Sequence, residues 1–270
     1  DGANWVEEPK VVERAGYKRD RRGYIDNLWS HVFVVPAGGG TARQLTDGNW
    51  NHAGLAWSPN GEEVYFSSYR TEDWDRPEHW QESEIYAVQV ESKVIRRLTH
   101  RVGPDKSPVP SPDGRLVAYT GIDAHHDTYK NEKIHVMQRD GSKSRIISEN
   151  FDRQVRSMKW ADDGSGLYFN VRRDGYQQLH FVSIDKGVKQ LTEGKHLFAL
   201  SSFSNEGIGV GTIATAHDPA DLYRFSVSAP QTPTRLTNVN VDVLSHVQLG
   251  EVEEVWYDSE GGFRVQGWVV

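Results

Sequence analysis

Two clusters of side chains belong to residue types that carry out chemistry, and both lie between strand-like segments. The first, His125-His126-Asp127, offers imidazoles and a carboxylate, which are ordinary transition-metal ligands. The second is the acidic and aromatic stretch 70–84. Adjacent histidines in a strand point to opposite faces, so a metal site would need a loop that turns both toward one ion. We interpret 125–127 as an exposed polar loop and expect no metal or other cofactor.

A nucleophilic enzyme needs a serine or cysteine held beside a base, and the sequence offers neither arrangement. The absence of cysteine excludes a thiol nucleophile, disulfides and cysteine-based zinc sites. No Gly-x-Ser-x-Gly turn is present, and Gly164-Ser165-Gly166 has the wrong spacing for one. No catalytic residue is therefore assigned, and the chain alone is expected to be inactive.

Composition indicates a folded, acidic domain. Hydrophobic residues make up 37% of the 270 residues, nine of which are Trp, enough for a substantial core. The net charge of -7 gives no electrostatic footprint for nucleic acid or an anionic membrane, and no apolar run approaches a spanning helix. No signal peptide is visible. Zero cysteine fits a reducing compartment, so we expect a cytoplasmic location.

The elements that must position these side chains repeat along the chain. Four turn phrases end in glycines spaced 53, 50 and 43 residues apart: Trp57-Ser-Pro-Asn-Gly61, Pro110-Ser-Pro-Asp-Gly114, Trp160-Ala-Asp-Asp-Gly164 and Phe203-Ser-Asn-Glu-Gly207. A second phrase keeps the same period: Leu45-Thr46, Leu98-Thr99, Ile147-Ser148, Leu191-Thr192 and Leu236-Thr237. Two independent phrases at one period establish a structural repeat.

Each repeat reads as four antiparallel strands. In the first repeat, 53–57 enters the turn, 63–68 leaves it, 84–90 alternates in period 2, and the Leu-Thr phrase closes the unit. Four strands in 40–50 residues are typical of a blade, so the sequence predicts an all-β fold, a β-propeller. About four to five blades form an incomplete ring, whose open edges predict self-association.

The repeated residues are interpreted as architecture, because a catalytic residue is rarely copied into each blade. Trp57 and Trp160, with Pro110 and Phe203, are expected to pack between blades. The other motif positions shape turns: Pro59, Gly61, Pro112, Asp113, Gly114, Gly164 and Gly207.

The predicted boundaries follow from the phrases. Residues 1–250 form the propeller part, with a leader at 1–28, a partial blade at 29–52 and blades from about 53, 104, 153 and 197. Residues 251–270 break the repeat and form a hairpin around Ser259-Glu-Gly-Gly262. The hairpin reads as the start of another domain, so we expect the chain to be a piece of a larger protein.

With these residues in view, the chain resembles the propeller domain of the prolyl oligopeptidase family of serine peptidases, closest to the acylaminoacyl-peptidase branch. The resemblance covers essentially the whole chain. Its most specific stretches are "HVFVVPAGGGTARQLTDG" (31–48), "FSSYRTEDWDRPEHWQESEIYAV" (66–88) and "RRLTHRVGPDKSPVPSPDGRLVAYTG" (96–121).

The resemblance implies that 251–270 opens an α/β-hydrolase domain, the partner of the propeller, whose catalytic triad lies beyond Val270. It also implies that the propeller admits short or N-acylated peptides and excludes folded proteins. Trp74, Asp75, Arg76 and Trp80 are then candidates for the interface with the hydrolase domain. Glu7-Glu8 superficially matches the glutamate pair that binds a peptide's amino terminus in the dipeptidyl-peptidase branch.

One further group of charged residues and two alternative functions complete the predictions. Arg156, Arg172 and Arg173 are interpreted as blade-edge charges. A stand-alone propeller that acts as a protein-binding scaffold is the alternative function, and it requires a closing strand where the chain has the hairpin. A metal-dependent lyase for sugar acids would need histidines at matched blade positions, which the sequence lacks.

Overall fold

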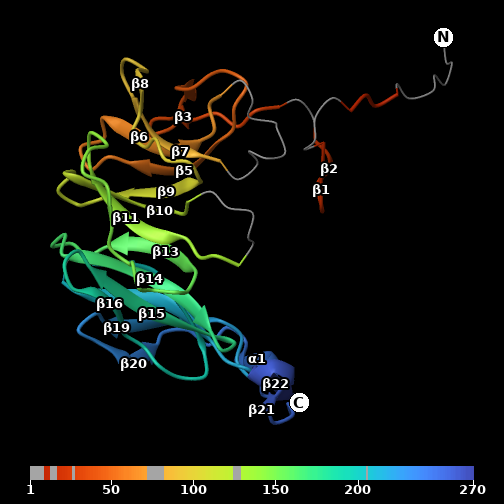
Figure 1. Cartoon of the computed structure of the whole chain (residues 1–270). Coiled ribbons are helices and arrows are strands. Elements are labelled where there is room, and N and C mark those ends of the chain that lie inside the picture. The colour runs from red at the N-terminus through yellow and green to blue at the C-terminus, as the bar shows by residue number, and fades with distance from the viewer. Residues whose placement is uncertain (1–8, 13–16, 26–27, 72–81, 124–128, 205) are drawn as a thin grey trace.

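The structure is a computed structural model that describes residues 9–12, 17–25, 28–71, 82–123, 129–204 and 206–270. Four units of four strands follow one another along this part of the chain (Figure 1). Blade 1 holds β5 (His52–Trp57), β6 (Glu63–Ser68), β7 (Glu84–Gln89) and β8 (Ile95–Arg97). Blade 2 holds β9 (Asp105–Pro110), β10 (Leu116–Gly121), β11 (Lys133–Gln138) and β12 (Arg145–Ile146). The predicted all-β propeller fold is confirmed.

The second half of the chain continues the pattern. Blade 3 holds β13 (Val155–Trp160), β14 (Gly166–Arg173), β15 (Tyr176–Ser183) and β16 (Gly187–Gln190). Blade 4 holds β17 (Leu197–Phe203), β18 (Ile208–Ala214), β19 (Asp221–Ser226) and β20 (Ala229–Arg235). A parallel contact between β15 and β17 joins blades 3 and 4 into one sheet.

Smaller elements flank the blades. β3 (Phe33–Val34) pairs with β4 (Arg43–Gln44) beside blade 1, and β1 (Lys18–Arg19) pairs with β2 (Gly23–Tyr24). After blade 4 come a short helix α1 (Val241–Leu244) and the hairpin of β21 (Glu253–Asp258) and β22 (Arg264–Val269), whose turn holds the 3₁₀ segment η2 (Glu260–Gly262).

The core lies between blades, because alternate residues of a strand face opposite sides of its sheet. On β6, Val64 and Phe66 pack toward the β3–β4 hairpin, whereas Tyr65 packs toward blade 2. On β10, Val117 and Tyr119 face blade 1, and the residue between them faces blade 3. Each blade thus needs a neighbour on both faces to bury its apolar residues.

The turn phrases adopt the predicted conformation. In each phrase the glycine N–H donates to the carbonyl three residues earlier, at 2.9 Å, with φ between +68° and +72° at Gly61, Gly114, Gly164 and Gly207. That left-handed backbone suits glycine, which lacks a Cβ.

The Leu-Thr phrase closes each blade through a recurrent hydrogen-bond pattern, here called the threonine clasp. In blade 1, the Thr99 hydroxyl accepts the Ile85 N–H at 2.9 Å and donates to Glu84 at 2.5 Å. Arg97, two residues before Thr99, donates to the Thr99 carbonyl at 2.9 Å and to Glu84. Three side chains therefore fasten the fourth strand to the start of the third.

The same clasp recurs in blades 3 and 4 and in the β3–β4 hairpin. The acceptor at the start of the third strand varies, and so does the donor two residues before the threonine. The trios are Gln178, Gln190 and Thr192; Asp221, Arg235 and Thr237; and His31, Gln44 and Thr46.

The motif tryptophans have different surroundings. Trp160 is 5% exposed and donates its indole N–H to the Val109 carbonyl of blade 2 at 2.8 Å, so it packs between blades. Phe203 packs edge-on against Tyr168 of blade 3. Trp57 is 53% exposed, and the prediction that it packs between blades is wrong for the described structure. Its neighbour, the β3–β4 hairpin, has only two short strands, which cover Val64 and Phe66 but not the inner strand β5.

Candidate functional site

Blade 2 departs from the threonine clasp. Where the other clasps have an acceptor at the start of the third strand, blade 2 has Lys133, and the donor two residues before the hydroxyl is replaced by Ile146. Ser148 still accepts the Ile134 N–H at 2.8 Å. The Lys133 ammonium reaches past it to the carbonyls of Glu149 and Phe151, at 3.0 and 2.7 Å. The chain after β12 is thus held by the Lys133 ammonium and the Ser148 hydroxyl, where the other blades use a threonine and its two polar partners.

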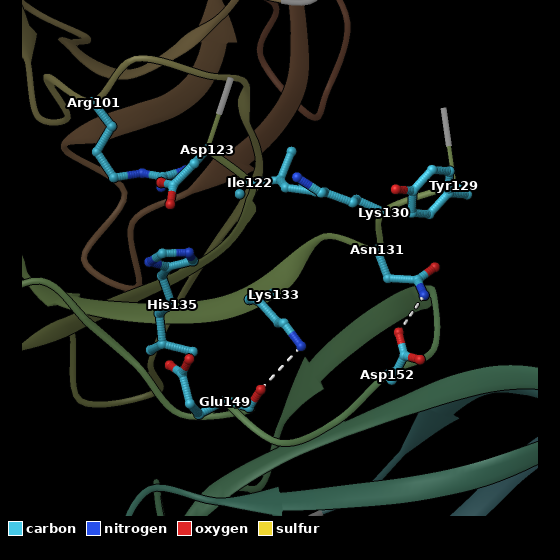
Figure 2. A pocket seen from close by; sticks show the side chains of 12 residues that line it. Arg101, Ile122, Asp123, Tyr129, Lys130, Asn131, Lys133, His135, Glu149 and Asp152 are labelled. Atoms are coloured by element: carbon cyan, nitrogen blue, oxygen red, sulfur yellow. Dashed lines mark hydrogen bonds and ion pairs between the residues drawn. The ribbon is translucent and has the colours of Figure 1, made fainter. Parts of the chain in front are cut away.

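A pocket of about 480 Å³ opens at this departure (Figure 2). Lys133, Ile146 and Glu149 line it together with residues of the loop after β10, including Ile122, Asp123 and Tyr129. In the other clasps a long polar side chain occupies the place of Ile146. The shorter, apolar Ile146 leaves that space open beside the sheet.

One wall of the pocket is a fixed charge network. The Arg101 guanidinium donates to Asp105 through Nη2 at 2.7 Å and to Asp123 through Nη1 at 2.6 Å. Asp105 is fully buried, and burial raises its pKa against the opposing influence of Arg101. Gly121 lies directly above it, where a Cβ would stand 2.3 Å from the Asp105 carboxylate. Any side chain at position 121 would displace Asp105 or Arg101, so this network requires glycine there.

The floor of the pocket is His135, which is 4% exposed and stacked on Tyr119 with ring centroids 4.9 Å apart. Burial, reinforced by the nearby Arg101 charge, lowers the pKa of His135 to about 4. The imidazole is therefore neutral at physiological pH, suited to stacking and hydrogen bonding. On the opposite wall, Asn131 donates to Asp152 at 3.0 Å (Figure 2).

The hairpin of β21 and β22 docks on the same face of the molecule. The pocket lies at the connection between the second and third strands of blade 2, and the hairpin contacts the corresponding connection of blade 3. Glu254 accepts from Tyr176 at 3.1 Å and pairs with Lys195 at 3.2 Å. Trp268 covers Gly175, where a Cβ would stand 2.3 Å from the indole ring. We call this side, with its pocket and hairpin, the loop face.

The sequence-based candidates have different positions. Trp74, Asp75, Arg76, Trp80, Glu7 and Glu8 lie outside the described residues, as does His125-His126-Asp127. β6 ends just before the stretch 70–84 and β7 begins at its last residue, and both of these strand ends lie on the loop face (Figure 1). Arg172 donates to Gln177 at 3.2 Å and Arg173 to Asp174 at 3.1 Å, both at the edge of blade 3, and Arg156 is exposed there.

Sequence reasoning missed the pocket and its residues Arg101, Lys133 and His135. The signal that could have found them is the variant phrase Ile147-Ser148, which breaks the Leu-Thr repeat in blade 2 alone. Among the residues that the structure describes, no cluster of three or more His, Asp or Glu could hold a metal ion. The described helices include none long and apolar enough to cross a bilayer.

Comparison with known sequences gives consistent relatives. Residues 2–121 match the family described as the dipeptidyl peptidase IV N-terminal region. Dipeptidyl-peptidase 5 of Porphyromonas gingivalis is 26% identical over 80% of this chain and 31% of its own length. The uncharacterized peptidase YuxL of Bacillus subtilis is 23% identical over 97% of this chain and 42% of its own length. The chain therefore spans about a third of the first of these relatives.

Solved structures agree on the fold. A puromycin-hydrolyzing peptidase of Mycobacterium tuberculosis superposes with a TM-score of 0.54 at 15% identity, over 91% of this chain and 47% of that one. Oligogalacturonate lyase of Vibrio parahaemolyticus gives 0.60 at 16% identity, over 79% of this chain and 61% of that one. These structural likenesses concern the fold alone.

The blades and the relatives together define the class as a β-propeller domain of the kind carried by peptidases. The chain is similar to the propeller domains of the prolyl oligopeptidase family.

Proposed function

We propose that this chain is the non-catalytic propeller of a serine peptidase, which controls the entry of peptides to a hydrolase domain in the same protein. The observation that carries the proposal is the match of residues 2–121 to the dipeptidyl peptidase IV N-terminal region, supported by relatives that are themselves peptidases. A rigid ring of blades passes an extended peptide and excludes a folded domain on steric grounds.

The docked hairpin supports the same proposal. β21 and β22 leave the blade repeat and pack on the loop face through Glu254 and Trp268. In our proposal this hairpin opens the hydrolase domain, and the loop face with its pocket faces the active site. The acylaminoacyl-peptidase branch, and with it a preference for N-acylated or short peptides, remains our prediction for the substrate.

An activity-based label tests the proposal directly. A fluorophosphonate forms a covalent bond with an activated serine, so it should label the product of the complete gene and not the 270-residue chain. The label should be prevented by prior incubation with a short peptide substrate. Labelling of the chain itself, or a complete gene product that hydrolyses no peptide and takes no label, would contradict the peptidase proposal and favour the binding scaffold.

A further inference from the structure

The departure of blade 2 from the repeat is concentrated at one cavity. Lys133 and Ile146 replace the two polar partners of the clasp, and both line the pocket. Residues that recur in every blade serve the architecture. In blade 2 alone, the two polar partners of the clasp are replaced, and they are replaced at the point where a cavity opens. Architecture does not explain this replacement. Filling the space with the usual glutamine or arginine would be the simpler structural solution.

The pocket offers a ligand one group of each charge. Glu149 lines the cavity, and within the described part of the chain its carboxylate has no hydrogen-bond or ion-pair partner. Lys133 donates to two backbone carbonyls, and an ammonium carries three N–H donors. One donor therefore remains. Arg101 and Asp152, by contrast, are already engaged with Asp123 and Asn131.

The charges of the described residues that line the cavity balance. Among them, three cationic side chains, Arg101, Lys130 and Lys133, face three carboxylates, Asp123, Glu149 and Asp152. A ligand with a net charge gains from one set and is repelled by the other. A ligand with a positive and a negative end can satisfy both. Ile122, Ile146 and Tyr129 add an apolar surface beside these groups.

From this arrangement we infer that the pocket of blade 2 binds a small zwitterionic peptide of about dipeptide size. Its ammonium end pairs with Glu149, its carboxylate accepts from Lys133, and an apolar side chain lies on Ile122 and Ile146. The inference deepens the proposed function, on which its biological sense rests, because such a peptide belongs to the class that a peptidase consumes or releases. The pocket belongs to the propeller, so binding does not require the hydrolase domain.

The test is calorimetric titration of this chain with the free dipeptide alanyl-phenylalanine, its N-acetyl form and its C-terminal amide. We expect saturable binding of the free dipeptide and roughly tenfold weaker binding of each blocked form, because a charged hydrogen bond is lost. Glu149→Gln and Lys133→Met should each weaken the binding of the free dipeptide by a similar factor. Glu193→Gln and Lys186→Met, at exposed positions outside the pocket, are the matched controls and should leave binding unchanged.

A rebuilt clasp provides a variant designed to fold. Lys133→Gln, Ile146→Gln and Ser148→Thr together copy the trio Gln178, Gln190 and Thr192 of blade 3. We expect this triple variant to keep the thermal stability of the parent and to lose dipeptide binding, because the glutamines fill the cavity.

Three results would overturn the inference: no saturable binding of the free dipeptide, equal binding of its blocked forms, or full binding by the triple variant. All are measured on the 270-residue chain, which in our proposal lacks the catalytic domain. A failure here therefore leaves the fluorophosphonate result, and the proposed function, to be judged separately.

Discussion

At the scale of single residues, buried histidines take the places of aromatic rings in the blades. His135 stacks on Tyr119 in blade 2, as Tyr86 stacks on Phe66 in blade 1. Burial lowers the pKa of His135 to about 4, against 6.5 for a free imidazole. The folded chain therefore excludes a proton that the unfolded chain accepts.

This difference makes stability depend on pH with a definite sign. Well above pH 6.5 the histidine is neutral in both states and does not change the free energy of unfolding. Between pH 6.5 and about 4 the unfolded chain binds more protons, so the free energy of unfolding falls as pH falls, by about 1.4 kcal/mol per pH unit at most. We expect His135→Tyr to remove this contribution. The free energy of unfolding of the variant, relative to that of the parent, should be about 2 kcal/mol higher at pH 4.5 than at pH 7.5.

Urea unfolding across this pH range measures the effect. His100→Tyr, at an exposed position, is the control and should follow the parent curve. Parallel curves for the parent and His135→Tyr would contradict the prediction.

At the scale of elements, the threonine clasp explains why a short fourth strand stays attached. β8 has only three residues, too few for backbone pairing alone to hold it firmly. In blade 1 the Thr99 hydroxyl serves as acceptor and donor at once and joins β7 to the chain after β8. Its carboxylate partner, Glu84, is buried, so the interaction is protected from water.

Removal of that hydroxyl should therefore be costly. Thr99→Val keeps the shape of the side chain but leaves the Ile85 N–H without its acceptor and the Glu84 carboxylate with Arg97 as its remaining partner. We expect a loss of about 1–3 kcal/mol in the free energy of unfolding, measured by chemical denaturation. Thr41→Val changes an exposed threonine in the same way and should shift stability by less than about 0.5 kcal/mol. Equal effects of the two substitutions would show that the clasp adds nothing.

At the scale of the whole molecule, the side of blade 1 that faces the β3–β4 hairpin is left uncovered at its inner strand, β5. Leu55 and Trp57 are 55% and 53% exposed, whereas Met158 and Trp160, at the matching positions of blade 3, are 9% and 5% exposed because blade 2 covers them. Adjacent apolar side chains on the edge strand β5 favour association with another surface.

We therefore expect this chain to self-associate through the Leu55–Trp57 face. Sedimentation velocity should show a weight-average mass that rises with concentration, and Trp57→Glu should return it to that of a monomer. Phe263→Glu, an exposed aromatic on the hairpin turn, is the control and should leave association unchanged. A parent chain that stays monomeric at every concentration would refute the prediction.

The sequence alone determined the fold class, because the signals for a blade are local. A Pro-Asx-Gly turn needs only its own residues to reverse the chain, and period-2 alternation assigns each side chain to one face of its strand. The phrase repeated at Trp57 and Trp160 therefore revealed the β-propeller and the residues that shape its turns. The family resemblance came from longer local stretches, 31–48, 66–88 and 96–121.

What those repeated residues contact depends on how the blades pack against one another. Trp57 and Trp160 stand in closely similar phrases, yet one is exposed and the other buried, because burial depends on the neighbouring blade and not on the phrase. The pocket joins Arg101, His135 and Glu149, which come from separate segments and meet only through strand pairing and the packing of blades. Such contacts between distant segments leave no pattern along a single sequence, so the candidate site had to come from the structure.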